Sequence, residues 1–529
     1  MPFIDLDRAS TRTYDACVIG SGPAGMAVAV SLSQKGQSVL LIDAGGTVPT
    51  PGPAANLSSQ QSHAPLCQTN CRALGGTSWM WGGRIMPLLK RDFVQMNWPL
   101  TYDSYAAYLD EAAAFLGGST LGRPFVREDI DRIDCNAVEM LAADLPIAQR
   151  HAKVLDAQDG PAILLSVVAT GLNLVTDPDG RVRCIGPRVR SLSNEAAVDL
   201  VARTTIVACG GVETARLLLA VQTRNPNELG HLKALGRGYC GHLTGSIAQM
   251  VLRKSVRPDG FGWVSRVQGG FTRQVFRMTQ TEPASGANVF FWARNCPIED
   301  AAHGSGIQSL KYILRRLRDG RGSASETGSP VLRHLVNVVR DAPTSLKALP
   351  GVLRSKFNRS RQHLDHLIAN GANAYRLCYH AEQSPSDTNF IALSGPVLPD
   401  QLPDIKISYA FSKADAEAVL RGHEALVKEL VASNVADVIY DEPIARRVDA
   451  ILKTASDGFH QIGIARMGKN AADSVVDQHC KLHGVSGIYV AGSSIFPSSG
   501  AAPPTQSIVA FALRLADHLT RAPVSSGGP

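Results

Sequence analysis

The sequence Tyr14-Asp-Ala-Cys-Val-Ile-Gly-Ser-Gly-Pro-Ala-Gly25, followed by Val39-Leu-Leu-Ile-Asp43, decides the fold of the N-terminal part of the chain. An apolar strand runs into a glycine-rich turn that opens a helix, and a second apolar strand ends on an acid. This order is typical of a dinucleotide-binding βαβ unit. Gly20 supplies a tight turn, Gly22 a bare backbone beside a pyrophosphate, and Gly25 close contact between helix and strand. The stretch predicts a parallel sheet that holds a nucleotide.

The helix predicted over 24–34 begins where free N–H groups and the positive end of the helix dipole would face phosphate. Pro23 and Ala24 open this helix, so we expect both to contact the nucleotide. Asp43 and Ala44 follow the second strand, where an acid suits an unphosphorylated ribose diol.

Length and composition indicate an ordinary globular protein. The chain has 529 residues, 44% of them hydrophobic and 19% charged, which predicts two to four domains or one large fold with an inserted domain. The sequence contains no apolar run of the ~18 residues that a membrane span needs. Asp5, Asp7 and Arg8 interrupt the N-terminus, so no secretory signal is expected and we predict a cytoplasmic protein. The ten cysteines are scattered, and we predict no metal site.

Further along the chain, two other segments have the composition of cofactor-contacting loops. Gly75-Gly-Thr-Ser-Trp-Met-Trp-Gly-Gly83 has no helical or alternating period and suits a loop that lies against a flat ligand. Residues 204–219 again give a strand, a glycine turn and a helix. We also expect a strand over 163–169 and a C-terminal helix over 507–520, whose apolar residues have helical spacing.

These segments together resemble the glucose-methanol-choline (GMC) family of FAD oxidoreductases, within it the branch of pyranose oxidases and bacterial sugar dehydrogenases. The resemblance implies an α/β fold, with a Rossmann-like FAD-binding domain built from discontinuous segments and an inserted α+β substrate domain whose sheet is mainly antiparallel. It spans nearly the whole chain and rests on six blocks: Gly20-x-Gly22-x-x-Gly25, Gly75–Gly83, Trp98-Pro-Leu-Thr-Tyr102, Ala208-Cys-Gly-Gly-Val-Glu-Thr-Ala-Arg216, His460-x-x-Gly463-x-x-Arg466-Met-Gly468, and Tyr489–Gly500 with Pro504-Thr505.

The resemblance also implies a division of the chain. The expected FAD-binding segments are 1–100, 161–250 and 456–529, and the last of them carries the active-site histidine. We expect a helical segment of the substrate domain over 101–160 and the main substrate domain over 251–455, with a basic insert over 305–365.

The expected cofactor is FAD, bound without a covalent link. In several relatives a histidine of the Gly-Gly-Thr-Ser loop bonds to the flavin, whereas this chain has Met80 there, and His63 is a lesser candidate for that role. The residues expected at FAD on the resemblance and the motifs are Gly20, Gly22, Pro23, Ala24, Gly25, Asp43, Ala44, Gly75, Gly76, Thr77, Met80, Trp81, Gly82, Gly83, Val168, Cys209, Gly210, Gly211, Gly492, Pro504 and Thr505.

The implied activity is oxidation of a primary or secondary alcohol on a sugar, glycoside or related polyol. A base must remove the hydroxyl proton while the carbon-bound hydride passes to flavin N5. His460 matches the family's active-site histidine and is the expected base. The C-terminal helix, which opens at Pro504 and Thr505, would place its positive end near flavin N1. The sequence leaves open whether oxygen, a quinone or another carrier accepts the electrons.

One position departs from the family pattern. Relatives place Asn or His before the Pro-Thr pair to hydrogen-bond the substrate, whereas this chain has Pro503, which has no N–H and no polar side chain. The loss of a charge-assisted hydrogen bond costs roughly 1.5 to 3 kcal/mol. Gln506 is the nearby polar residue that could replace it. Pro503 also supports an alternative, a flavoprotein with redox-neutral lyase or isomerase chemistry.

The basic insert suggests a second alternative. Between Lys311 and Arg361 there are twelve Lys and Arg against three acids, and the helical patterns place apolar and cationic residues on different faces. Such helices suit an anionic membrane surface or a phosphorylated substrate. Ordinary solvated helices are the other interpretation. A membrane-peripheral enzyme acting on a lipid-linked alcohol would fit the interpretation as membrane-binding helices. The lack of interleaved aromatic residues argues against binding of nucleic acid.

Overall fold

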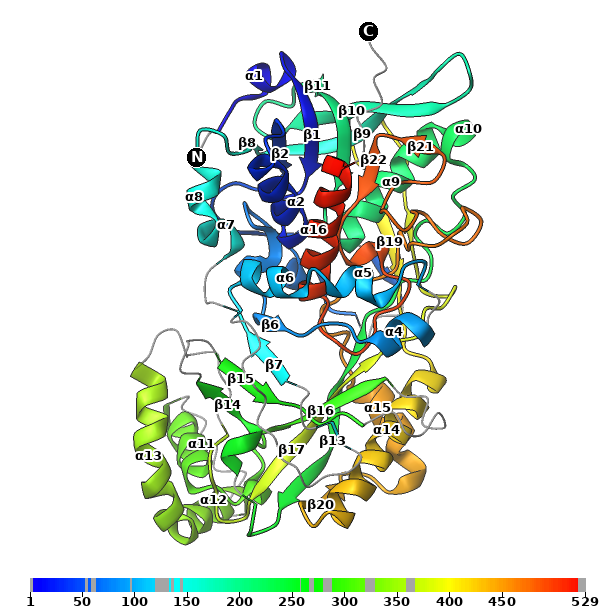
Figure 1. Cartoon of the computed structure of the whole chain (residues 1–529). Coiled ribbons are helices and arrows are strands. Elements are labelled where there is room, and N and C mark those ends of the chain that lie inside the picture. The colour runs from blue at the N-terminus through cyan, green and yellow to red at the C-terminus, as the bar shows by residue number, and fades with distance from the viewer. Residues whose placement is uncertain are drawn as a thin grey trace.

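The fold is described from a computed structural model that covers residues 3–52, 56–58, 63–95, 98–118, 133–134, 138–142, 146–256, 258–265, 271–278, 288–318, 329–357 and 367–521. Figure 1 shows two parts, one on the parallel sheet around β1 and one on a second sheet around β13 and β17. The chain passes between them several times, so both are built from segments that are distant in sequence.

The first part contains a parallel sheet in the order β22-β12-β1-β2-β8. All residues of β2 are buried, as expected for a sheet covered on both faces. The strands come from four distant regions, which confirms the discontinuous Rossmann-like architecture. Their bounds are β1 (Thr13–Ile19), β2 (Val39–Asp43), β8 (Ala162–Leu165), β12 (Val201–Val207) and β22 (Ile488–Val490).

The strand predicted over 163–169 is broken in the structure. Ser166 has φ of 58°, a left-handed conformation that no strand can continue through, so β8 ends before it. The chain then enters β9 (Val167–Thr176), which belongs to a second sheet. The other strands of that sheet are β10 (Val182–Ser191), β11 (Ala197–Asp199) and β21 (Val485–Ser486).

Three helices pack around the parallel sheet and confirm the predicted helical segments. They are α2 (Pro23–Gln34), α9 (Gly211–Arg224) and α16 (Thr505–Arg521), and α16 packs on α2 and on α6 (Leu109–Leu116). Two contacts fix the start of α16: the Trp98 and Phe511 rings stack at 5.4 Å, and the Tyr105 and Ser507 hydroxyls share a 2.7 Å hydrogen bond.

The second part is built on an antiparallel sheet in the order β16-β17-β13-β20, which confirms the mainly antiparallel sheet expected beside the parallel one. Two helices, α14 (Lys413–Ala432) and α15 (Arg447–Thr454), pack on it. Residues 242–250 lie in this sheet and not in the FAD-binding part to which the sequence assigned them. The strands are β13 (His242–Leu252), β16 (Val289–Arg294), β17 (Ala374–Glu382) and β20 (Ala436–Tyr440).

The remaining described elements surround these two sheets. One antiparallel sheet contains β6 (Arg84–Ile85), β7 (Val138–Leu141), β14 (Trp263–Ser265) and β15 (Phe271–Gln274). Smaller sheets contain β3 (Thr50–Pro51), β4 (Asn56–Ser58), β5 (Cys71–Arg72), β18 (Phe390–Leu393) and β19 (Ile405–Ser408). The basic insert forms α11 (Gly306–Arg318), α12 (Ser329–Arg340) and α13 (Ala342–Phe357). Among the helices described, none is both long and apolar enough to cross a membrane.

Candidate active site

A cavity of about 600 Å³ lies at the carboxyl ends of the parallel strands. Gly20 follows β1, Asp43 ends β2, Gly210 follows β12 and Gly492 follows β22, and all four line it. Ligands of open parallel sheets bind at this edge, because the loops that leave the strands diverge there. The cavity extends to residues of the second part, among them Thr244 and His380.

Most of the residues predicted for the cofactor and for catalysis come together around this one cavity. Four do not line it: Gly25, Gly75, Gly83 and Gln506. The predicted residues that do are Gly20, Gly22, Pro23, Ala24, Asp43, Ala44, Gly76, Thr77, Met80, Trp81, Gly82, Val168, Cys209, Gly210, Gly211, His460, Gly492, Pro503, Pro504 and Thr505.

The glycine-rich turn has the geometry that its spacing predicts. A Cβ on Gly20, whose φ is +100°, would lie 2.5 Å from the Ala208 carbonyl oxygen, and one on Gly25 would lie 1.8 Å from the Gly20 oxygen. Both positions therefore exclude a side chain. A Cβ on Gly22 would meet no atom within 4 Å, and Gly22 caps α2 without any side chain that satisfies the first N–H groups. The space at Gly22 is thus open at the first turn of α2, where the N–H groups of a helix have no partner within the helix, as an anion site requires.

Asp43 sits at the end of β2 with a carboxylate that already accepts protein hydrogen bonds. One oxygen accepts from the backbone N–H and the hydroxyl of Ser21, at 2.8 and 2.6 Å, and the other accepts from the Gly45 N–H at 2.7 Å. Burial raises its pKa, although these donors oppose the shift. A carboxylate has about four acceptor positions, so one remains for a ligand hydroxyl.

Three histidines meet at the far end of the cavity. His460 lies in the loop after α15, His242 begins β13, and His380 lies in β17 directly opposite Thr244. Nδ1 of His460 is 2.8 Å from Nδ1 of His242, and one ring nitrogen from each of the three lies within 4.8 Å of the others. His242 and His380 are buried, whereas His460 keeps partial exposure and lines the cavity with His380.

The environment keeps this histidine cluster neutral. Burial lowers the pKa of His460 well below its ordinary value, and the neighbouring His242 and Arg84 lower it further. Burial likewise lowers the pKa of His242 to about 3 and that of His380 well below its ordinary value. Neutral imidazoles can accept a proton, so the cluster is chemically suited to a base.

The loop before α16 fixes the tautomer of His380. Its Nδ1 donates to the Ala501 carbonyl at 2.7 Å, which leaves Nε2 unprotonated. The Nε2 atoms of His380 and His242 are both enclosed and have no hydrogen-bond partner within the described ranges. Behind the same loop, Glu382 accepts from the Gly500 N–H at 3.3 Å and from Asn288 at 2.9 Å.

The structure contradicts the role expected of Gln506. Its side chain is buried and its Nε2 donates to the Leu109 carbonyl at 3.1 Å, so it faces α6 and not the cavity. Because Gln506 lies in the first turn of α16, whose direction is set by packing on α2 and α6, its side chain cannot replace the partner that Pro503 lacks. Pro503 itself lines the cavity.

Comparisons with known proteins agree with this geometry. The family model of GMC oxidoreductases matches residues 385–512, and that of pyridine nucleotide-disulphide oxidoreductases matches residues 14–82. These matches support a GMC-family FAD-dependent oxidoreductase. The chain is therefore an FAD-dependent oxidoreductase.

Two curated relatives are distant in sequence but align with nearly the whole chain. The chain is 23% identical to 6'''-hydroxyparomomycin C oxidase from Streptomyces lividus, over 96% of this chain and 92% of that protein. It is 22% identical to 2-methyl-1,2-propanediol dehydrogenase from Mycolicibacterium austroafricanum, over 97% and 96%. Among solved structures, pyridoxine 4-oxidase from Mesorbium loti matches with a TM-score of 0.55 at 17% identity, over 96% of this chain and 99% of that one.

The cavity fits FAD as GMC enzymes use it. The open space in front of Gly22 and α2 suits the pyrophosphate, and Asp43 keeps an acceptor position for a ribose hydroxyl. Met80 lines the cavity and offers no nitrogen for a covalent link. His63 does not line it; its ring is buried, with Nε2 at 2.8 Å from the Tyr239 hydroxyl.

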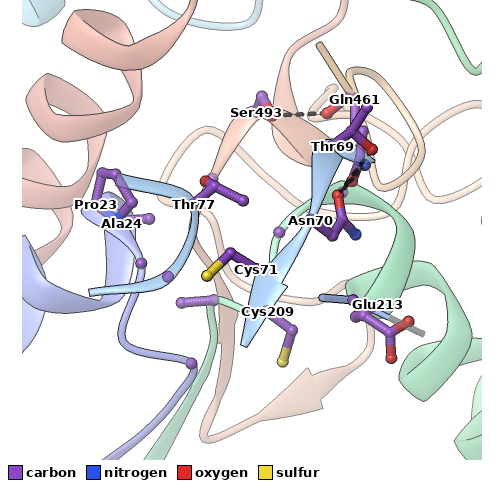
Figure 2. A pocket seen from close by; sticks show the side chains of 18 of the residues that line it. Pro23, Ala24, Thr69, Asn70, Cys71, Thr77, Cys209, Glu213, Gln461 and Ser493 are labelled. Atoms are coloured by element: carbon purple, nitrogen blue, oxygen red, sulfur yellow. Dashed lines mark hydrogen bonds between the residues drawn. The ribbon is translucent and has the colours of Figure 1, made fainter. Parts of the chain in front are cut away.

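Several cavity residues were not predicted from the sequence. Figure 2 shows Asn70, Cys71 and Glu213 among the labelled lining residues, together with the predicted Pro23 and Cys209. Asn70 is held by Gln461, whose Nε2 donates to its side-chain oxygen at 2.7 Å. Asn70 and Cys71 belong to none of the six blocks, and Glu213 lies in the Ala208–Arg216 block but had no expected role at the cofactor.

Three further residues that line the cavity near His460 were not predicted: Arg84, Thr244 and His380. Thr244 and His380 are strand residues that face each other only because β13 pairs with β17. Arg84 carries a charge that reaches all three histidines and is bonded to the buried Glu139. Pairing between distant strands has no local sequence signal.

Proposed function

We propose that this GMC enzyme oxidises a hydroxyl group of a sugar, glycoside or related polyol, with His460 as the base and with FAD bound without a covalent link. Bound FAD supplies the two-electron acceptor for the carbon-bound hydrogen, and the product is a carbonyl compound. The observation that carries the proposal is the hydrogen bond between His460 and His242, which occupies Nδ1 of His460 and leaves Nε2 as its remaining ring nitrogen.

We propose that His242 carries its proton on Nε2 and accepts at Nδ1, because a hydrogen bond between two neutral imidazoles needs one donor and one acceptor. His460 then donates from Nδ1 to His242, and Nε2 of His460 carries the lone pair that accepts the hydroxyl proton. His242 is thus a positioning residue for the base.

Thr244 is the proposed replacement for the partner that Pro503 lacks. It lines the same end of the cavity, and its backbone N–H donates to the Ser456 carbonyl at 3.0 Å, which fixes its place beside the loop that carries His460. A threonine hydroxyl can donate to a substrate oxygen, which a proline ring cannot do. The names of two relatives, a hydroxyparomomycin oxidase and a propanediol dehydrogenase, support a hydroxyl-rich substrate.

The test compares three variants in anaerobic reduction of the bound flavin by a panel of sugars, glycosides and polyols. His460→Gln should lower the reduction rate by about 100-fold to 10,000-fold and leave the oxidised flavin spectrum and FAD content unchanged, because it removes a general base. Thr244→Val should lower kcat/KM by about twofold to tenfold, and Thr244→Ser should keep the wild-type value. Retained reduction in His460→Gln would remove His460 from the proposal, and equal rates in Thr244→Val and Thr244→Ser would remove Thr244.

A further inference from the structure

The helices of the basic insert, α11, α12 and α13, pack against one another at the edge of the second part of the molecule (Figure 1). An ordinary surface helix buries its apolar residues and exposes its polar ones. These three helices differ from that arrangement. Here several of the contacts between the helices are hydrogen bonds, and many leucines and valines of the same helices are exposed.

Polar side chains hold the inner faces together. His334 of α12 is buried, stacks on Tyr312 of α11 at 4.0 Å and has Nδ1 at 3.0 Å from the Ser309 hydroxyl. Asn337 donates to the same hydroxyl at 3.2 Å. The buried Asp341, between α12 and α13, accepts from the Gly306 N–H at 2.7 Å at the start of α11. These bonds fix the orientation of the helices, so the outward direction of the leucines is set by the fold.

The outer faces carry apolar residues at helical spacing. Leu317 is 73% exposed, Val339 75% and Leu346 69%. We call this set the insert face: Leu310, Leu314, Leu317, Leu332, Leu335, Val336, Val339, Leu346 and Leu349. Large apolar residues that are exposed on neighbouring helices are typical of a binding surface.

The charge around the insert face identifies its partner. The sequences of α11, α12 and α13 contain no Asp or Glu, whereas they contain nine Lys and Arg. Arg333, Arg340 and Lys347 are exposed beside the apolar residues, and Arg315 reaches Glu299 outside the helices at 3.3 Å. Helices that lie in the interface of an anionic membrane have this composition, with cationic residues beside exposed apolar ones.

We propose that the insert face docks on an anionic lipid surface. A second copy of this chain is a less suitable partner for the insert face. A symmetric contact would bring the Lys and Arg residues of two insert faces together, and the three helices contribute no acids to pair with them. The proposal does not depend on the substrate or the catalytic residues, since the insert face contributes no residue to the lining of the cavity.

The test is flotation of the FAD-loaded full-length enzyme with vesicles of phosphatidylcholine containing 30 mol% phosphatidylglycerol, and with vesicles of phosphatidylcholine alone. Two sets of substitutions separate the contributions: Leu317→Glu with Val339→Glu for the apolar stripe, and Arg333→Glu, Arg340→Glu and Lys347→Glu for the charge. Ile444→Glu is the matched control, because Ile444 is 69% exposed and lies outside the insert. Flavin absorbance confirms that each variant is folded.

The wild type and Ile444→Glu should float with the anionic vesicles at 0.15 M salt and much less with the neutral ones. Each cation lost should lower the partition coefficient about fivefold, so the triple charge variant should lose at least 100-fold. The double apolar variant should stay unbound. Absence of wild-type flotation, or flotation that either set of substitutions leaves unchanged, would overturn the proposal. A soluble dimer that Leu317→Glu with Val339→Glu dissociates, without flotation of the wild type, would assign the insert face to a second copy.

Discussion

Nδ1 of His460 lies 2.8 Å from Nδ1 of His242, although 218 residues separate them in the sequence. His242 comes from the antiparallel sheet and His460 from the loop that leads back to the parallel sheet, so the base is held at the junction of the two parts of the molecule. A hydrogen bond between two neutral imidazoles requires one ring to donate and the other to accept, so the tautomers of the two histidines are linked. The orientation of the proposed base therefore depends on both parts.

The rate of flavin reduction by substrate should keep its full value to lower pH than an ordinary histidine base would allow. Burial, His242 and Arg84 all lower the pKa of His460, so its neutral form persists below the ordinary imidazole value of 6.5. The measurement is the reduction rate between pH 5 and 8. Arg84→Met should move the acid limb upward toward 6.5, because it removes a positive charge while Glu139 keeps Arg273 as its partner. An acid limb above pH 7 in the wild type would contradict this prediction.

Gly22 and Gly25 should respond differently to alanine. A Cβ at Gly22 would point into open space, so Gly22→Ala should leave the apoprotein's stability within about 0.5 kcal/mol and weaken FAD binding about 10-fold to 100-fold. A Cβ at Gly25 would collide with the Gly20 oxygen at 1.8 Å, so Gly25→Ala should lower the stability of the apoprotein by about 1 to 3 kcal/mol or more. FAD titration and thermal unfolding of the apoproteins measure the two effects. Equal effects of both substitutions on stability would argue against an open pyrophosphate site at Gly22.

Glu382 should make the protein less stable as pH rises. Burial raises its pKa from 4.5 to about 7, and the nearby Asp92 adds to the shift. Below pH 4.5 the folded and unfolded states are both protonated, between 4.5 and 7 the unfolded state alone loses the proton, and above 7 the difference is constant. The total loss is about 3 kcal/mol for this group. The measurement is the free energy of unfolding at pH 5 and at pH 8. Glu382→Gln should remove the part of the difference between these two values that Glu382 causes. A difference that is the same in the wild type and the variant would show that Glu382 is already ionised at pH 5.

The histidine cluster should hold protons and not a metal ion. Its ring nitrogens lie within 4.8 Å of one another, a spacing that a metal could also occupy. The hydrogen bond between His460 and His242 joins one ring nitrogen of each, which fits the positioning role proposed for His242. We expect less than 0.1 metal ion per chain by elemental analysis, and flavin reduction unchanged by a chelator. A stoichiometric metal whose removal abolishes flavin reduction would replace the proposed histidine base with a metal site.

The parallel part of the fold could be predicted because its signals are local. The turn at Gly20 and Gly22, the helix after it and the acid at Asp43 occupy one continuous stretch, and each residue has a separate steric or electrostatic role. The C-terminal helix was predicted from its apolar spacing. The break at Ser166 was missed because a short apolar run gives no sign of a residue with positive φ.

The other wall of the site could not be predicted, because strand pairing creates it. His242, Thr244 and His380 are brought together by the register of β13 and β17, and none of them belongs to a motif. Gln506 was wrongly predicted to contact the substrate. It is close to the site in sequence, but the packing of α16 directs its side chain toward Leu109. Sequence distance along a helix does not give the direction of a side chain without knowledge of the face that the helix buries.

The most direct test of the central claim is anaerobic titration of the purified FAD-loaded protein with a panel of sugars, glycosides, polyols and apolar alcohols, followed by flavin absorbance in the wild type and in His460→Gln. We predict that hydroxyl-rich members bleach the wild-type flavin and that the same members leave the His460→Gln flavin oxidised on the same time scale. An unbleached wild-type flavin across the whole panel would contradict the proposed sugar or polyol oxidation and favour redox-neutral chemistry at the site beside Pro503.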